Sequence, residues 1–204
     1  MTERSIAVVT AGLSQPSSTR LLADRLATAT RDALLQGGDE ASIHVVELRE
    51  LATDIAHHLV TQVPGAALRS ALDTVRSADG LIAVTPVFTA SYSGLFKSFV
   101  DVIGNEDLVG LPVLLGATGG TERHSLVLDY QMRGVFAYLR ALPAPTAVYA
   151  ASSDWGSGDG HLGRRIERAA GEFAELVAGR TPPRPSTSDS GLTSVPFEQL
   201  LTGE

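Results

Sequence analysis

The sequence predicts an α/β fold of three layers, in which one parallel sheet lies between two layers of helices. Five short apolar runs recur along the 204 residues, and their continuous apolarity is typical of strands buried on both faces. Helical patterns lie between the runs, and this alternation indicates parallel strands joined by right-handed crossovers. Five strands favour the doubly wound order 2-1-3-4-5 over a six-stranded dinucleotide-binding sheet.

The five strands are expected where β-branched residues are concentrated, at Ile6–Thr10, Ile43–Val46, Leu81–Thr85, Pro112–Gly116 and Ala147–Ala150. Two of the intervening segments carry an apolar stripe at helical spacing. The stripe residues are Leu22, Leu26, Ala29 and Ala33 in the first helix, and Leu162, Ile166, Ala169, Phe173 and Leu176 in the last. These elements predict a flavodoxin-like three-layer sandwich with a five-stranded parallel sheet.

Residues 1–180 are predicted to form one domain, because 204 residues suffice for one full core and not for two. Residues 181–204 begin with a stretch rich in proline and hydroxyl side chains, which is typical of an extended or disordered linker. An apolar cluster, VPFEQLL, follows near the C-terminus. Two interpretations of this tail stay open: a frayed end, or an arm that docks on a neighbouring subunit.

Composition and charge exclude several classes of function. The formal net charge of −7 and the lack of a basic run argue against nucleic acid as the main partner. The chain has no cysteine, which excludes disulfides, thiolate catalysis and zinc–sulfur sites. Its five histidines lack metal-ligand spacing, so no metal site is expected. We recognise no signal peptide or membrane span, and we therefore expect a cytoplasmic protein.

The first candidate site follows the first strand, in the segment AGLSQPSSTRLLADRL. Four hydroxyl residues (Ser14, Ser17, Ser18 and Thr19) crowd this loop, although one serine would suffice as a helix N-cap. Hydroxyl groups and free backbone N–H groups at a helix N-terminus form an anion site suited to a phosphate. The loop is neither a Walker loop nor a Rossmann fingerprint, since no Gly-Lys-Ser/Thr occurs and Gly12 stands alone.

Two further strand ends carry small residues. In TPVFTASYSGLFKSFVD, Pro86 is predicted to end the third strand, because proline cannot donate a ladder hydrogen bond. Ala90 and Ser91 would let a flat ligand approach the backbone, and Phe88 would wall that ligand or simply pack. In GATGGTERH, two adjacent glycines after the fourth strand indicate close approach of the same ligand. A phosphate loop flanked by two such loops predicts a phosphorylated planar cofactor, FMN.

Together these three segments resemble the NADPH-dependent FMN reductase family, and most closely the reductases that supply reduced flavin to two-component monooxygenases. The resemblance covers residues 5–178 and includes GSGDGHLGRRIERAAGEFAEL, which is similar to the family's last helix. It implies a flavodoxin-like fold, FMN bound by its phosphate at the first loop with its ring against the other two, and a dimer or tetramer. The implied cofactor-binding residues are Ser14, Gln15, Ser17, Ser18, Thr19, Pro86, Val87, Phe88, Thr89, Ala90, Ser91, Thr118, Gly119 and Gly120. The chain departs from the family at two of them: Gln15 stands where many members have arginine, and Phe88 where tyrosine is common.

The sequence thus predicts an enzyme, an NAD(P)H-dependent FMN reductase that transfers a hydride from NADPH or NADH to FMN. The reduced flavin would serve a partner such as a flavin-dependent monooxygenase. No catalytic acid or base is assigned, because the flavin carries the chemistry. The alternatives are a quinone or azo reductase on the same scaffold, a flavodoxin-type electron carrier and a phosphate-binding regulatory module.

Five charged or titratable residues near these loops are candidates for other roles. Lys97 and Asp101 lie four apart in a predicted helix and are expected to form an ion pair or an interface contact. Arg20 and Arg123 are candidates for binding the 2′-phosphate of NADPH. His124 is a candidate for reaching the flavin or the nicotinamide.

A homodimer or homotetramer is expected from an apolar stripe in the fourth helix. The stripe comprises Met132, Val135, Phe136 and Leu139, beside Tyr130 and Tyr138. One sheet face would cover only part of this surface, and a large exposed apolar patch is unusual on a monomer. The proline-rich segment is long enough to bring the apolar residues of the tail to a partner subunit.

Overall fold

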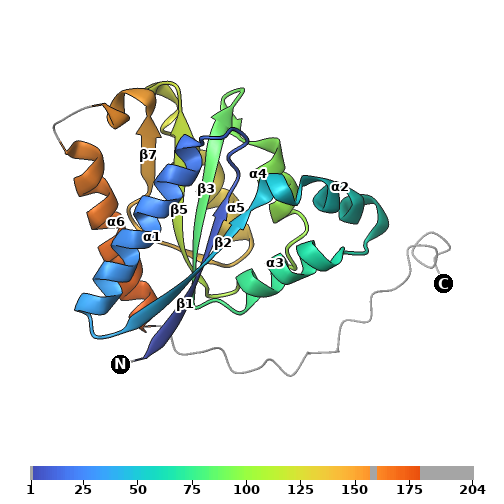
Figure 1. Cartoon of the computed structure of the whole chain (residues 1–204), viewed down its shortest axis with the longest axis horizontal. Coiled ribbons are helices and arrows are strands. Elements are labelled where there is room, and N and C mark those ends of the chain that lie inside the picture. The colour runs from blue at the N-terminus through green and yellow to red at the C-terminus, as the bar shows by residue number, and fades with distance from the viewer. Residues whose placement is uncertain (1, 157–159, 180–204) are drawn as a thin grey trace, which may run out of the picture.

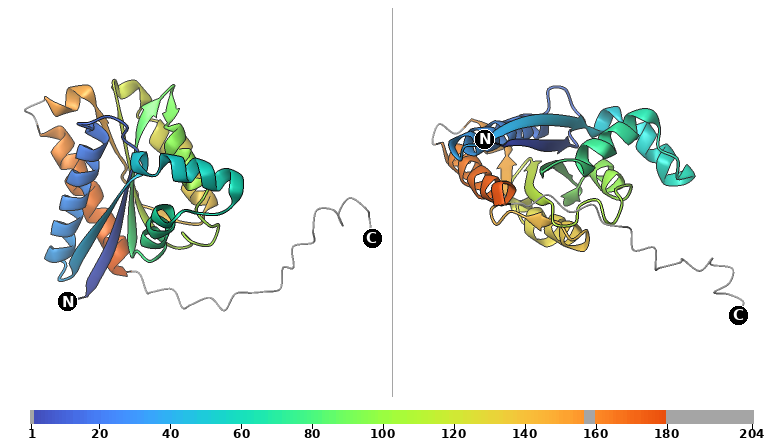
Figure 2. Two further views of the ribbon diagram at one scale, coloured as in Figure 1. Left: turned by 45° about the vertical axis from the view of Figure 1, so that its right-hand side comes forward. Right: turned by 90° about the horizontal axis from the view of Figure 1, so that it is seen from below.

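The computed structural model describes residues 2–156 and 160–179, in which a sheet separates two layers of helices (Figure 1, Figure 2). The strands are β1 (Glu3–Thr10), β2 (Glu40–Glu47), β3 (Gly80–Phe88), β4 (Ser91–Tyr92), β5 (Pro112–Gly119), β6 (Leu142–Pro143) and β7 (Val148–Ala151). The α-helices are α1 (Ser18–Gln36), α2 (Ala52–Thr61), α3 (Ala66–Arg76), α4 (Gly94–Val100), α5 (Arg133–Tyr138) and α6 (His161–Gly179). Short 3-10 helices are η1 (Leu48–Glu50), η2 (Glu122–His124) and η4 (Ser152–Trp155), and η3 (Leu128–Met132) is a π-helix. The tail at 181–204 lies outside the described residues, so both interpretations of it stay predictions.

The three-layer α/β architecture is confirmed. β1 pairs in parallel with β2 and β3, and β3 pairs in parallel with β5. The last predicted strand lies on the far side of β5, which completes the flavodoxin-like order 2-1-3-4-5. Within the described part of the chain, every helix is too short or too polar to span a bilayer.

The sheet has seven strands rather than the predicted five. β6 and β7 pair in parallel with successive parts of β5, so they are two pieces of one edge strand. Pro143 and Pro145 lie at or next to the break between them, where proline cannot donate to the ladder. The other added strand, β4, is a two-residue antiparallel partner of β3.

Pro86 does not end the third strand, which corrects the expectation from the sequence. β3 continues through Pro86 to Phe88, and Pro86 lies in register with Thr118 of β5. The carbonyl of Val84 accepts from the N–H of Ala11 at 3.0 Å, so the backbone polar groups of Val84 point toward the β1 side of the strand. The backbone of Pro86, two residues later, is directed to the same side, but β1 has already ended there. Among the described residues, no strand on that side needs an N–H from this position, so proline costs the sheet no hydrogen bond.

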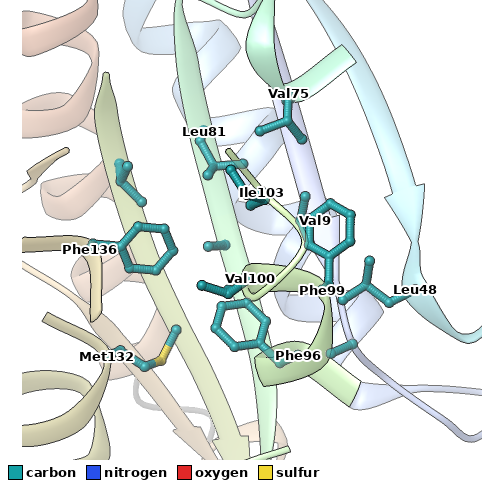
Figure 3. Close-up of a cluster of buried hydrophobic side chains, with 14 of the residues drawn as sticks. Val9, Leu48, Val75, Leu81, Phe96, Phe99, Val100, Ile103, Met132 and Phe136 are labelled. Carbon is teal, nitrogen blue, oxygen red and sulfur yellow. The ribbon is translucent and has the colours of Figure 1, made fainter. Parts of the chain in front are cut away.

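Each face of the sheet is covered by its own hydrophobic cluster. On one face, α1 and α6 bury large side chains such as Leu26 and Phe173. On the other, Phe96, Phe99 and Phe136 are at most 2% exposed, and the rings of Phe96 and Phe136 lie 6.4 Å apart (Figure 3). Burying one such side chain stabilises the fold by about 1.5–3 kcal/mol. The packing of both helix layers therefore stabilises the sheet.

The predicted apolar stripe of the fourth helix belongs to this second cluster, which corrects the expectation that much of it is exposed. Met132, Phe136 and Leu139 are at most 4% exposed, and Val135 packs against the cluster from its edge (Figure 3). The stripe therefore faces the sheet of its own chain. The exposed aromatic residues of this segment are Tyr130 and Tyr138, at 79% and 78%.

Candidate functional site

The three predicted loops meet at the carboxyl edge of the sheet. Thr19 Oγ1, in the first turn of α1, lies 2.8 Å from Thr118 Oγ1 near the end of β5, and both side chains are buried. Pro86 lies beside Thr118 in the register of the sheet. Residues that are far apart in the sequence thus share the edge at which open α/β sheets bind ligands.

The loop before α1 ends in a regular helix cap. Ser17 is the N-cap, and its hydroxyl accepts from the backbone N–H of Arg20 at 3.2 Å. The first N–H groups of a helix have no helical partner, which leaves those of Ser18 and Thr19 for a ligand or water. The first turn of α1 holds no acidic side chain, so the positive end of the helix dipole is not neutralised there.

The predicted phosphate-binding side chains divide into two groups. Ser14, Gln15 and Ser18 are exposed on this loop. Ser17 and Thr19 instead bond within the protein, as the helix cap and as the partner of Thr118. The backbone N–H of Thr19 is in addition a donor that can bind an anion.

Two further residues, Gly12 and Thr10, shape the phosphate side of the site. A Cβ atom at Gly12 would overlap the hydroxyl of Ser17, so only glycine leaves room for the cap. Thr10, the last residue of β1, is 2% exposed, and its hydroxyl has no hydrogen-bond partner within the described residues. Buried hydroxyls normally have a partner, which a bound polar group would supply. A polar residue that ends an apolar run is the signal that would have identified Thr10.

Charged side chains behind the loop form a network that the sequence analysis missed. Arg20 bonds to Asp24 at 2.8 Å and to Glu47, and Glu47 also accepts from Arg49 at 3.1 Å. The hydrogen bond that Arg20 donates to Asp24 raises the pKa of the Arg20 guanidinium. With its amide oriented so that the oxygen faces Arg49, Gln15 accepts from that guanidinium as well. Arg49 thereby ties the loop to the end of β2, a contact that has no signal in the local sequence.

Arg20 is committed to two carboxylates, so it is a poor candidate for the 2′-phosphate of NADPH. The other two candidates for nucleotide contact, Arg123 and His124, lie exposed on η2, directly after the turn that follows β5. Their roles stay predictions.

The second predicted loop is the hairpin formed by β3 and β4. Its two turn residues, Thr89 and Ala90, have φ angles of 50° and 65°, in the left-handed region that two-residue hairpin turns use but that favours glycine. The buried hydroxyl of Thr85 accepts from the N–H of Ser93 at 3.0 Å, which fixes the return of the chain. Phe88 is 47% exposed, so its ring lies at the surface of this edge and not in the core.

The two glycines of the third loop lack a side chain for different reasons. A Cβ atom at Gly119 would overlap the hydroxyl of Tyr149, which donates to the carbonyl of Thr121 at 2.7 Å. A Cβ atom at Gly120 would meet no atom within 4 Å. Gly119 therefore makes room for Tyr149, whereas Gly120 is open to a ligand. Burial raises the pKa of Tyr149 and keeps its phenol protonated as a donor.

A cavity of about 700 Å³ lies away from these loops, between α1 and α6. It is lined by residues such as Ala29, Asp32 and Gly163, and by none of the predicted site residues. We assign the functional site to the loops, because their donors converge at the edge where parallel sheets bind ligands.

Comparison with known proteins identifies the family of the chain. A family model described as NADPH-dependent FMN reductase matches residues 4–156, which include all three loops. An FMN reductase (NADPH) from Pseudomonas aeruginosa is 36% identical over 182 residues, covering 86% of this chain and 94% of that protein. The NADH-dependent FMN reductase SfnE of Pseudomonas putida is 36% identical over 172 residues, covering 83% and 90%.

A solved structure of an oxidoreductase from Corynebacterium diphtheriae is similar as well. It is 43% identical in sequence and superposes with a TM-score of 0.85, over 88% of this chain and 99% of that one. The chain belongs to the NADPH-dependent FMN reductase family.

Proposed function

We propose that the three loops bind FMN, with its phosphate at the loop before α1 and its ring against the β3–β4 hairpin and the turn after β5. Membership of its family makes the chain an NAD(P)H-dependent FMN reductase, and the proposal concerns where and how it binds the flavin. One observation carries it. The hydrogen bond of 2.8 Å between Thr19 and Thr118 holds the start of α1 against the end of β5. The loop proposed for the phosphate and a loop proposed for the ring therefore lie at the same edge of the sheet.

The residues present fit a phosphorylated flavin. The backbone N–H groups of Ser18 and Thr19 and the exposed hydroxyls of Ser14 and Ser18 are donors at a helix N-terminus, where a phosphate is stabilised. When bound, FMN supplies the redox chemistry by accepting a hydride from the nicotinamide. The chain's own part is to bind the phosphate, to hold the hairpin against the ring and, through Phe88, to keep water from it.

A titration with FMN and with riboflavin tests the phosphate site. Hydrogen bonds to a charged group contribute about 1.5–3 kcal/mol each, so FMN is expected to bind at least about tenfold more tightly. Equal affinities for FMN and riboflavin would show that this loop does not bind the phosphate.

Addition of NADPH and of NADH to the loaded protein then measures nucleotide preference. Steady oxidation with FMN as acceptor supports the proposal, and faster turnover with a quinone or azo acceptor supports the alternative.

We also propose a homodimer formed over the groove between α4 and the η3–α5 segment. The groove has a volume of about 530 Å³, and its lining includes Lys97, Asp101 and Tyr138. Lys97 and Asp101 form the expected ion pair at 2.5 Å. Aromatic rings are enriched at interfaces, and the exposed ring of Tyr138 lines this groove. A mass near the 21.4 kDa of one chain at micromolar concentration would contradict the dimer.

Finally, we propose that reduced FMN leaves the protein and serves a partner such as a flavin-dependent monooxygenase. The exposure of Ser14, Gln15 and Ser18 supports release, because a phosphate bound there is reachable from solvent. Ultrafiltration after reduction with NADPH should pass the flavin into the filtrate, whereas retention of the flavin would favour a tightly held prosthetic group. The cytoplasmic location stays a prediction.

A further inference from the structure

The turn of the β3–β4 hairpin needs support from outside itself. Thr89 and Ala90 both have a left-handed backbone, and neither is the glycine or asparagine that this conformation favours. Residues held in such a conformation persist only where surrounding contacts over-determine them, and they are concentrated at functional sites. The question is which contact holds this turn.

The contact comes from Gln131, a residue of η3 about 40 positions further along the chain. The hydroxyl of Ser91 donates to Gln131 Oε1 at 2.5 Å, and Gln131 Nε2 donates to the carbonyl of Ala90 at 3.4 Å. One amide group therefore bonds to both the side chain and the backbone at the end of the turn. Gln131 and Ser91 are both half-buried, so water competes only in part for the bond between their side chains, whereas the longer bond to Ala90 is exposed.

The π-helix fixes the position of this amide. Leu128 and Met132, at the two ends of η3, are 4% and 0% exposed and anchor it in the core beneath the sheet. Gln131 precedes the buried Met132 and reaches the hairpin instead. Single π-turns are frequent at functional sites, and here the turn joins a rigid anchor to a polar contact.

We infer that Gln131 is a positioning residue, which holds Ala90 and Ser91 in the conformation that receives the flavin ring. The inference rests on the proposed function, which places the ring against Pro86–Ser91. Gln131 acts through the hairpin and not on reacting atoms. Without its amide, the hairpin would spend part of its time in other conformations, and the apparent affinity for FMN would fall by the fraction of molecules that stay competent.

The test compares Gln131→Met, which keeps the volume and removes both hydrogen bonds, with Asp129→Asn. Asp129 lies on the same π-helix and is exposed, and its ion pair is with Arg133 at 2.8 Å, away from the hairpin. FMN affinity is measured by fluorescence quenching, and hydrogen exchange of residues 88–92 is measured without FMN. The mass and melting temperature of each variant are recorded, since Gln131 also lines the α4–α5 groove.

Gln131→Met is expected to weaken FMN binding about tenfold, as for the loss of two ordinary hydrogen bonds. It should raise the KM for FMN with little change in kcat, and it should speed exchange in the hairpin while the melting temperature falls by no more than about 2–4 °C. Asp129→Asn should change none of these. In an Ala90→Gly background, where glycine adopts the left-handed turn by itself, the effect of Gln131→Met should shrink.

Three results would overturn the inference. If wild-type protein binds FMN and Gln131→Met binds it equally well, Gln131 does not position the site, and the proposed function stands. Equal losses in Gln131→Met and Asp129→Asn would indicate general destabilisation of η3 instead. If wild-type protein binds no FMN, the proposed function fails together with the inference.

Discussion

The loop before α1 and the β3–β4 hairpin lie at the same edge of the sheet, but different contacts hold them. In the loop, Ser17 caps the helix by accepting from Arg20, three residues later, and Gly12 leaves room for that cap. In the hairpin, the left-handed Ala90 and its neighbour Ser91 bond to Gln131, which lies on another element of the fold.

This difference predicts how each half of the site behaves. The cap is a local contact, which forms with the helix itself and needs little help from the rest of the chain. The hairpin keeps its conformation only as long as η3 stays packed beneath it. We therefore expect the phosphate side of the site to be preformed in the free protein, and the ring side to depend on tertiary packing. The predictions below test this contrast, beginning with the largest expected effect.

Gly12→Ala should damage the phosphate side most. The added Cβ atom would overlap the hydroxyl of Ser17, and overpacking of this kind destabilises by about 1–3 kcal/mol. FMN binding should weaken at least tenfold, or about 1.4 kcal/mol, because the cap and the first N–H groups are displaced together. Urea unfolding and an FMN titration measure the two effects. The matched control is Gly120→Ala, whose Cβ atom meets nothing within 4 Å and should leave stability within about 0.5 kcal/mol.

Two neighbouring serines should separate folding from binding. Ser17→Ala removes the N-cap and should lower stability by about 1 kcal/mol, or the melting temperature by about 2–4 °C. Ser18→Ala removes an exposed hydroxyl, so stability should not change while FMN binding weakens by about 1 kcal/mol. Thermal melts and FMN titrations of both variants give the comparison. If Ser18→Ala has an unchanged dissociation constant, its hydroxyl does not contact the phosphate.

On the ring side, Ala90→Gly should raise the stability of the protein instead of lowering it. Glycine removes the penalty of a left-handed alanine but loses more entropy on folding, so stability should rise by about 0.5 kcal/mol. Ala137→Gly is the matched control, because Ala137 is exposed in α5 and the same change in a helix should destabilise by about 1 kcal/mol. Equal destabilisation of both variants in urea would show that the hairpin turn stores no strain.

The smallest effect concerns the third loop, at alkaline pH. Burial raises the pKa of Tyr149 above its ordinary value of 10.0, and its phenol donates to Thr121. A pKa raised in the folded state stabilises the protein fully below the unfolded value and no longer does so as pH rises through the folded value. Unfolding free energies between about pH 8 and about pH 11 should therefore fall above pH 10, and Tyr149→Phe should remove this decline. Tyr138→Phe, at an exposed site, should not alter it.

The sequence by itself determined where the main strands lie along the chain, the two helices with clear stripes and the serine-rich start of α1. Each of these depends on neighbours within a few residues or on apolar periodicity, which the chain carries locally. The same information placed the candidate site, because three polar or glycine-rich loops follow strands whose ends must share an edge.

The tertiary structure alone decided how the loops are built. Pro86 stays within β3 because β1 has already ended beside it, and the hydroxyls of Thr19 and Thr118 bond to each other between α1 and β5. Gln131 holds the hairpin from a distant element, and Arg49 adds a long-range contact to the loop whose cap is local. These contacts join residues 30 to 100 positions apart in round numbers, and no local pattern encodes them, since the folded sheet and its two packed layers alone bring such residues together.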